Sequence, residues 1–264
     1  MRVPIFHVDA FTSVRFKGNP AAVIPLERYP DDATLQAIAA ENNLSETAFL
    51  EPAGAAWNLR WFTPTVEVPL CGHATLASAW VVFERLARER AEVSFLTRRS
   101  GELRVRRGER GGLQMDFPSR PLRRLEPGPD LTSALGATPL EILANDDNYA
   151  AVLPSASAVR GLTPDIGAIG RLDRPGLIVT AAGDAGYDCV SRYFAPQKGI
   201  AEDPVTGGAH CALTPYWSAK LGKKELVAFQ ASARGGVLRC RAMGDRVALA
   251  GECVLYSEGH AEVD

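Results

Sequence analysis

The sequence predicts an α+β fold of two pseudo-symmetric domains, each a curved, mainly antiparallel sheet wrapped around a central helix. Residues 72–88 are predicted to form a helix that is apolar on nearly all sides for its first three turns, as expected for a helix buried on every face. Short segments of alternating polarity, joined by Gly-rich turns, favour antiparallel strands around it. An internal repeat indicates that this architecture occurs twice.

The repeat relates two strand–loop–helix segments in the two halves of the chain. Residues 60–64 (RWFTP) and 67–74 (EVPLCGHA) match residues 192–196 (RYFAP) and 202–209 (EDPVTGGA). The offset is 132 residues for the first pair and 135 for the second, so the second loop is three residues longer. An apolar helix that contains a tryptophan follows each match. Agreement over so many positions in one context indicates a duplicated domain.

The pattern of the first half predicts strands and two helices. Residues 18–20 (GNP) are a turn signal between the first two strands. We expect strands at residues 2–11, 21–25, 45–50, 59–63, 92–97, 102–107 and 113–117. Asp31 or Asp32 caps a helix that ends at residues 42–43, because these residue types suit those ends. Adjacent hairpin strands do not fit a doubly wound parallel sheet, which needs helical crossovers.

Residues 118–129, with four prolines, are the predicted linker near the midpoint of the chain. We expect domains at residues 1–118 and 119–264, with the C-terminal segment able to return to the first domain. The same kinds of element then recur. We expect strands at residues 149–153, 177–181, 189–194, 226–230, 236–242 and 246–256, and helices near residues 130–135 and 207–221.

The composition is that of an ordinary globular protein. The 264 residues carry 29 Lys and Arg against 31 Asp and Glu, and a net charge of −2 gives no general reason to bind nucleic acid. The longest strongly apolar stretch, residues 74–83, is too short to span a bilayer, and the N-terminal segment lacks the apolar core of a signal peptide. We therefore expect a cytoplasmic protein that binds neither nucleic acid nor membrane.

The cysteines and histidines predict neither disulfides nor a metal site. The five cysteines are odd in number, widely spaced and without a Cys-x-x-Cys pair. His7 and Asp9 have metal-like spacing on one strand face, but no further residue completes a ligand set. The sequence fingerprints of dinucleotide-binding, P-loop and serine-hydrolase-elbow proteins do not occur either.

Glu46 and His73 are the candidate proton-transfer groups. On the predicted strand Glu46 shares a face with Ala48 and Leu50, and apolar surroundings raise the pKa of a carboxyl that must accept and return a proton. His73 follows Gly72 at the start of the buried helix, where the helix dipole lowers the pKa of an imidazole. The alternatives are a solvated glutamate at a helix–strand junction and a histidine that only hydrogen-bonds locally.

Asp203 and Cys71 are further candidates near the two helix starts. Asp203 corresponds in the repeat to Val68, so the duplicated fold does not demand a polar residue there; the alternative is an Asx turn before proline. A helix start lowers the pKa of a thiol such as that of Cys71. The counterpart of Cys71 in the repeat is Thr206, so the second thiol of a two-base racemase is missing. The alternative to a reactive Cys71 is a cysteine that only fills the core as a small hydrophobic residue.

The helix starts at Gly72 and Gly207 are the predicted anion-binding elements. Each offers free backbone N–H groups and the positive end of a helix dipole, which suit a carboxylate or a phosphate. We expect both to face a cleft between the domains, since such clefts commonly bind ligands.

Six segments, in order along the chain, carry a family resemblance. They are DAFT (9–12), GNPAAV (18–23), LSETAF (44–49), RWFTP (60–64), CGHAT (71–75) and GIAEDPVTG (199–207). Together they resemble the phenazine-biosynthesis isomerase (PhzF-like) family, over most of the chain. The resemblance implies the diaminopimelate epimerase-like fold, in agreement with the repeat.

The resemblance also implies cofactor-free acid–base chemistry, usually in a homodimer. The family's characterised member isomerises a dihydro-hydroxyanthranilate by moving a proton across a conjugated ring. Its proton-shuttling glutamate corresponds to Glu46, its active-site histidine to His73 and its aspartate to Asp203. The family's phenazine enzyme has a serine where this chain has Gly208, which argues against the phenazine substrate and leaves the fold and Glu46 unaffected.

We therefore expect a cofactor-independent isomerase whose small, carboxylate-bearing substrate binds between the domains. Glu46 takes a proton from carbon and returns it elsewhere, while His73 and Asp203 position the substrate or relay the proton. The residues expected to bind the substrate are Asn19, Cys71, Gly72, Thr206, Gly207 and Gly208. The alternatives are a racemase or epimerase that uses Cys71, and a non-catalytic small-molecule binder on the same fold.

Overall fold

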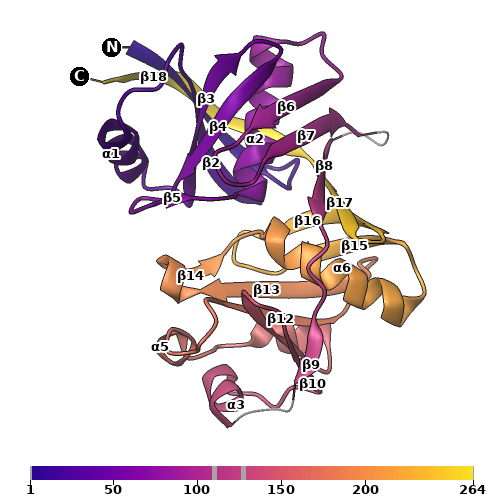
Figure 1. Ribbon diagram of the computed structural model, residues 1–264. Helices are drawn as coiled ribbons and strands as arrows, with labels where there is room; N and C mark the ends of the chain where they lie inside the picture. Colours follow the sequence, from indigo (N-terminus) through magenta and orange to yellow (C-terminus); the bar gives the residue numbers. More distant parts are fainter. Residues whose placement is uncertain (1, 109–111, 126–128, 264) are drawn as a thin grey trace. The chain divides into compact units, whose positions relative to one another are not determined.

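The computed structural model describes residues 2–108, 112–125 and 129–263. The chain divides into two compact units (Figure 1). The first comprises Met1–Asp116 and Ala250–Asp264, and the second comprises Phe117–Leu249. The end of the chain therefore returns to the unit in which the chain begins. Among the described residues, no helix has the length and apolar character needed to cross a membrane.

The first unit is built on a mainly antiparallel sheet. Its strands are β1 (Arg2–Ala10), β2 (Asn19–Pro25), β3 (Glu46–Ala53), β4 (Ala56–Phe62), β5 (Glu67–Val68), β6 (Glu92–Leu96), β7 (Glu102–Arg107), β8 (Leu113–Pro118) and β18 (Cys253–Glu262). The strand β1 lies between β18 and β2 and is antiparallel to both. The pairs β2–β3 and β4–β6 are parallel, whereas β3–β4, β4–β5, β6–β7 and β7–β8 are antiparallel.

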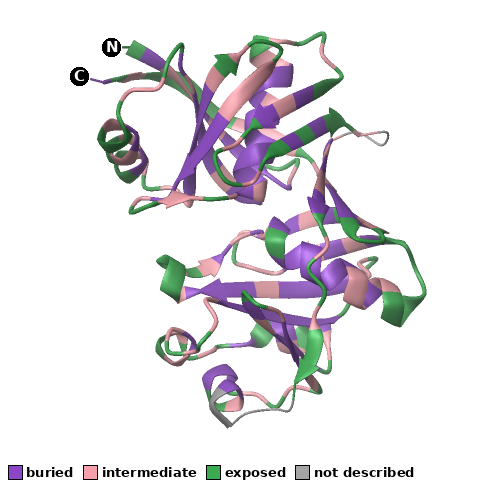
Figure 2. Cartoon of the chain, in the orientation of Figure 1, coloured by how far each residue is buried: buried purple, intermediate pink, exposed green. Residues whose placement is uncertain are grey.

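One buried helix forms the centre of the first unit, as the sequence predicts. The helix α2 (Gly72–Val81) packs against β1, β2, β3 and β18 and buries eight of its ten residues (Figure 2). The α-helix is shorter than the predicted segment 72–88. A π-helical turn, η1 (Val82–Leu86), follows it, and the N–H of Ala87 donates to the carbonyl of Val82 at 2.7 Å. This i+5 hydrogen bond ends the regular helix early.

The other helix of the first unit, α1 (Asp32–Asn42), has the predicted ends. Asp31 is the N-cap, and its Oδ1 accepts a 2.7 Å hydrogen bond from the N–H of Thr34. Asn43 ends the helix in the left-handed conformation with a φ of 49°. Asp32, the other candidate cap, pairs instead with the guanidinium of Arg60 at 2.8 Å.

The second unit repeats the strand order of the first. Its strands are β9 (Arg123–Leu125), β10 (Glu141–Ala144), β11 (Asn148–Val152), β12 (Gly176–Ala182), β13 (Cys189–Ala195), β14 (Ile200–Asp203), β15 (Glu225–Gln230), β16 (Gly236–Met243) and β17 (Arg246–Gly251). The pairs β11–β12 and β13–β15 are parallel, and β12–β13 and β15–β16 are antiparallel. The series β11-β12-β13-β15-β16 thus has the same parallel and antiparallel steps as β2-β3-β4-β6-β7. The strand β9, which pairs with β10, lies within the segment predicted as a linker.

The helices of the second unit are α3 (Pro129–Leu135), α4 (Ala156–Gly161), α5 (Ile166–Ile169), α6 (Gly207–Leu221) and the 3-10 turn η2 (Pro196–Lys198). The central helix α6 has the predicted bounds and packs on β15 and β16. The sequence pattern does not predict α4 or α5, which are too short for an apolar period to emerge. Side-chain caps begin them: Ser155 Oγ accepts from the N–H of Ala158, and Asp165 Oδ1 from that of Ala168.

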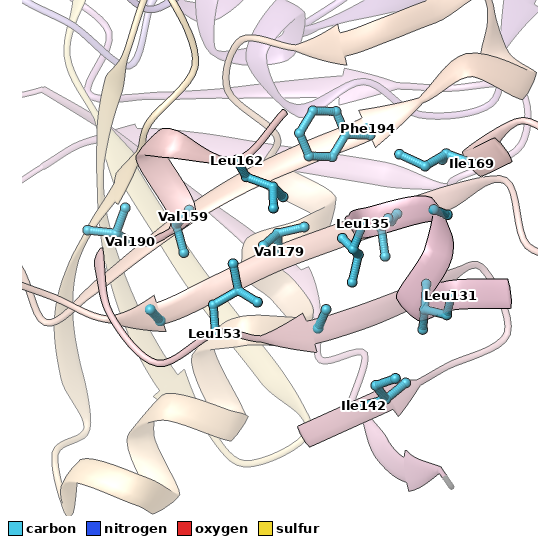
Figure 3. Packing of buried hydrophobic residues seen from close by; sticks show 14 of the residues in the cluster. Leu131, Leu135, Ile142, Leu153, Val159, Leu162, Ile169, Val179, Val190 and Phe194 are labelled. Atoms are coloured by element: carbon cyan, nitrogen blue, oxygen red, sulfur yellow. The ribbon is translucent and has the colours of Figure 1, made fainter. Parts of the chain in front are cut away.

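A core cluster joins these short helices to the sheet (Figure 3). Leu131 and Leu135 from α3, Val159 from α4 and Ile169 from α5 are all at most 5% exposed. They pack with residues of β11, β12 and β13, among which Phe194 is 1% exposed. Burial of such apolar surface explains why helices with little intrinsic stability form here.

Matched ion pairs confirm the duplication at the level of side chains. Arg60 binds Glu67 in a bidentate manner, with N–O distances of 2.7 and 2.9 Å, and Arg192 binds Glu202 with the same two distances. Each guanidinium also lies 4.9 Å from the ring centre of the phenylalanine two residues later. The sequence repeat therefore corresponds to a repeated ion pair between a long strand and the short strand that precedes a central helix.

Candidate active site

The starts of β3 and α2 bring Glu46 and His73 together. Glu46 is the first residue of β3 and pairs with Ala21 of the parallel strand β2. His73 is the second residue of α2. Both side chains are almost fully buried, at 9% and 5% exposure, and Glu46 Oε2 lies 3.2 Å from His73 Nε2. The two atoms are as close as in a hydrogen bond, although they do not meet the geometric criteria for one. They are close enough for a proton to pass from one group to the other.

The other side of the His73 ring faces two more predicted site residues. Nδ1 lies 3.1 Å from Asn19 Nδ2 and 3.5 Å from Cys71 Sγ. Asn19 begins β2 and is fully buried, and Cys71 is the N-cap of α2. The Cys71 side chain makes no capping hydrogen bond, whereas its carbonyl accepts from the hydroxyl of Thr75 at 2.6 Å. The structure therefore gathers Asn19, Glu46, Cys71 and His73 into one cluster.

Burial decides the charge of His73. It lowers the pKa of His73 to about 3, and contact with the backbone of Pro20 opposes this only in part. The ring is therefore neutral near pH 7, with one nitrogen protonated and the other free to accept a proton. The sequence predicts a lowered pKa through the helix dipole; in the structure the dominant cause is loss of water around the ring.

In the second unit, Asp203 and Thr206 share one hydrogen-bonded turn. Asp203 ends β14 and is 9% exposed, and its Oδ2 accepts a 2.5 Å hydrogen bond from the hydroxyl of Thr206, the N-cap of α6. Gln230 holds this turn in place. Its Nε2 donates to the Asp203 carbonyl at 2.7 Å, and its Oε1 accepts from the Thr206 N–H at 2.8 Å. The hydrogen bond from the Thr206 hydroxyl holds the Asp203 carboxylate in a fixed orientation.

Gly72, Gly207 and Gly208 are the first residues of the two central helices. Their backbone N–H groups lie in the first turn, where donors lack partners within the helix. A Cβ added at Gly208 would meet nothing within 4 Å, so the family's serine would fit at this position. The structure therefore gives no steric reason for a glycine at position 208.

Two buried polar residues that contact the Asp203–Thr206 turn were not among the sequence-based candidates. Gln230 is fully buried, and His210 is 1% exposed with Nδ1 donating to the Thr206 carbonyl at 2.8 Å. Burial lowers the pKa of His210 to about 4. The internal repeat could have identified His210. It aligns His210 with Thr75, and Thr75 hydrogen-bonds to the Cys71 carbonyl, the counterpart of the Thr206 carbonyl. Gln230 has no such signal, since it reaches the turn from β15.

Comparison with known proteins places these features in a family. The sequence profile described as phenazine biosynthesis-like protein matches residues 8–259. An uncharacterized isomerase of Pseudomonas aeruginosa is 49% identical, with 98% of each chain covered. The crystal structure of a PhzF-family phenazine biosynthesis protein from Enterococcus faecalis superposes with a TM-score of 0.95 at 43% identity, covering all of both chains.

A more distant likeness concerns the fold alone. A probable proline racemase from Agrobacterium radiobacter has a TM-score of 0.66 at 10% identity, with 99% of this chain and 93% of that chain covered. The α+β architecture is thus the PhzF and diaminopimelate epimerase-like fold. On the profile match and the identities above, this chain belongs to the phenazine biosynthesis-like (PhzC/PhzF) family, and it is an isomerase.

Proposed function

We propose that this isomerase moves a proton on a small, carboxylate-bearing substrate without a cofactor, with Glu46 as the proton carrier. The observation that supports it most directly is the 3.2 Å approach of Glu46 Oε2 to His73 Nε2 in a nearly water-free setting. A carboxylate placed there takes a proton from a substrate carbon, holds it as the neutral acid and returns it to another carbon.

The neutral state of His73 supports this role. A protonated imidazole at 3.2 Å would hold the carboxylate in a buried ion pair and oppose proton uptake. Because burial keeps the pKa of His73 near 3, the ring stays neutral and can instead exchange a hydrogen bond with either form of Glu46. His73 thus positions Glu46 or relays its proton, and Asn19 orients the ring from the Nδ1 side.

The second unit has no proton acceptor at the positions that correspond to Glu46 and His73. Thr47 pairs with Phe62 as Leu177 pairs with Phe194, so Gly176 stands where the first unit has Glu46. By the repeat offset, Gly208 corresponds to His73, and Thr206 corresponds to Cys71. This asymmetry favours a reaction in which one base removes and returns the proton, over a racemase with two equivalent bases.

The remaining predicted residues enter the proposal as substrate-binding groups. Gly72 and Gly207 each begin a central helix whose first-turn N–H groups suit a carboxylate of the substrate. Asp203, oriented by its hydrogen bond to Thr206, positions a hydroxyl or amine of the substrate. Asp203→Asn keeps an acceptor for the Thr206 hydroxyl and is expected to lower kcat/KM. Unchanged kcat/KM would remove Asp203 from the mechanism.

Proton NMR in heavy water tests the role of Glu46. A panel of small carboxylates, dihydro-hydroxyanthranilate included, is followed with wild type and with Glu46→Gln. We expect one compound to isomerise or to exchange a carbon-bound proton for deuterium, and Glu46→Gln to slow this by about 100-fold or more. The control is Glu41→Gln on the exposed face of α1. Full exchange by Glu46→Gln would contradict the proposal.

The alternative mechanism is a racemase or epimerase that uses Cys71. Its supporting observation is the 3.5 Å distance from Cys71 Sγ to His73 Nδ1, which allows the imidazole to take the thiol proton. The alternative predicts that Cys71→Ser abolishes turnover and that substrate protects the wild type from thiol alkylation. Glu46-centred proton transfer predicts that Cys71→Ser retains turnover.

We further propose that the protein is a cytoplasmic homodimer. None of the five cysteines forms a disulfide bond in the structure, which is the usual state in a reducing compartment. The homodimer rests on the family resemblance. Light scattering at micromolar protein is expected to give twice the 28.3 kDa chain mass, and a monomer mass would refute the dimer.

A further inference from the structure

The donor atoms of Glu46, Cys71 and His73 form a compact cluster that proton transfer uses only in part. One ligand atom from each residue lies within 4.8 Å of the other two. The three groups supply a carboxylate oxygen, a sulfur and an imidazole nitrogen. This mixed set suits Zn²⁺ and similar borderline cations, whereas Mg²⁺ and Ca²⁺ prefer oxygen ligands alone.

The separations in the cluster are close to those around a tetrahedral ion. With Zn–S near 2.3 Å and Zn–N and Zn–O near 2.1 Å, neighbouring ligands of one ion stand about 3.4 to 3.6 Å apart. His73 Nδ1 lies 3.5 Å from Cys71 Sγ, and His73 Nε2 lies 3.2 Å from Glu46 Oε2. One ion takes only one ring nitrogen. The third ligand atom, which lies at most 4.8 Å from the other two, then has to move about 1 Å closer to them. Rotation of the side chain provides a movement of this size.

The His73 ring provides a second observation. Its buried Nε2 makes no hydrogen bond within the described part of the chain. That nitrogen lies 3.2 Å from the Glu46 carboxylate. A buried nitrogen that lies beside a carboxylate without a hydrogen bond is an observation separate from the spacing, and it too points to a ligand between them.

We propose that Glu46, Cys71 and His73 form a binding site for Zn²⁺, with the fourth position left to water or to a group of the substrate. The thiol proton passes to solvent as the metal–sulfur bond forms, so the apparent affinity rises with pH. A bound ion engages the Glu46 carboxylate and withdraws it from proton transfer, and Zn²⁺ is then an inhibitor. Only the inhibition rests on the proposed function; the binding does not.

Cobalt titration of the full-length, reduced protein tests the site without a substrate. Co²⁺ is the probe, because its absorption shows whether a thiolate is bound, and Zn²⁺ is then added as competitor. We expect one Co²⁺ per chain with a thiolate-to-cobalt band, and displacement by Zn²⁺, which binds such sites more tightly. Cys71→Ser should lose the band. Glu46→Gln should keep the band but lower the affinity for Co²⁺ by about tenfold or more. Loss of a residue that only hydrogen-bonds to a metal ligand already has an effect of this size.

The control is Cys253→Ser, which alters a cysteine outside the cluster and should behave as wild type. A band that persists in Cys71→Ser, or wild type without saturable one-to-one binding, overturns the site. Glu46→Gln is nearly isosteric, so unchanged Co²⁺ affinity in this variant overturns it even where Cys71→Ser fails to fold. Zn²⁺ that binds as described but leaves turnover unchanged would contradict the proton-carrier role of Glu46 and not the site.

Discussion

At the scale of single residues, two buried histidines share one electrostatic property. His73 and His210 lie in the first turns of the two central helices and are 5% and 1% exposed. Burial lowers their pKa values to about 3 and about 4. Their contacts differ: His73 faces Glu46, whereas His210 bonds to the backbone at Thr206. Burial thus keeps both rings neutral. His73 can then exchange a hydrogen bond with Glu46, whereas His210 hydrogen-bonds to the backbone.

The low pKa of His210 makes stability depend on pH. The unfolded chain protonates this histidine below about pH 6.5, whereas the folded chain does not until about pH 4. The unfolded state then binds more protons, so the free energy of unfolding falls as pH drops through this window, by up to roughly 1.4 kcal/mol per pH unit. His210→Asn retains a donor for the Thr206 carbonyl and should remove that part of the slope.

Urea unfolding between about pH 6 and pH 5 measures the effect, with His260→Asn on the exposed part of β18 as the control. Equal slopes in wild type and His210→Asn would show that His210 is protonated in the folded protein.

At the scale of elements, equivalent strands of the two units begin differently. Glu46 begins β3, and Gly176 begins β12. In the second unit the space is taken by the hydroxyl of Tyr193, which donates to Asn148 Oδ1 at 3.0 Å and accepts from Lys198 Nζ at 3.1 Å. The two strands occupy equivalent places in the duplicated fold, but only the first unit has a carboxylate at the start of its strand.

This packing predicts a large cost for a methyl group at Gly176. A Cβ there would lie 2.1 Å from Asn148 Oδ1 and 2.3 Å from the Tyr193 hydroxyl. Gly176→Ala is therefore expected to destabilise the protein by about 1–3 kcal/mol through overpacking. Thermal and chemical denaturation measure the change, with Gly161→Ala as the matched control, because a Cβ at Gly161 meets nothing within 4 Å. Similar stabilities of the two variants would rule out the overpacking.

At the scale of the whole molecule, the last strand completes the first unit. The strand β18 pairs antiparallel with β1 from Arg2 to Ala10 (Figure 1). Phe16 and Tyr256 add an edge-to-face ring contact at 5.6 Å. The unit that contains Glu46 and His73 therefore needs both ends of the chain.

Truncation before Cys253 tests this dependence. Removal of β18 leaves the hydrogen-bonding groups on one side of β1 unpaired, and such edges are unstable and prone to association. We expect faster hydrogen exchange in β1 and β2, with protection retained in α6 and β15 of the second unit. Unchanged exchange in β1 would mean that the first unit folds without its last strand.

The sequence by itself determined the features that depend on near neighbours and on repetition. Apolar residues in segment 72–88 predicted a buried helix, residues 31–32 and 42–43 marked the ends of α1, and the repeat predicted two similar units. Family motifs singled out Glu46, His73 and Asp203. These features can be predicted from sequence because helix and strand periods, caps and turns depend on residues only a few positions apart.

Only the tertiary structure decided which distant side chains meet. Glu46 and His73 are 3.2 Å apart because β3 lies parallel to β2 beneath the start of α2. Gln230 reaches the Asp203 turn from another strand, and Gly176 matches Glu46 only through the strand register. No local pattern encodes these contacts, because they depend on how strands pair across long separations in sequence. The loss of water that neutralises His73 likewise arises only when the sheet closes around its helix.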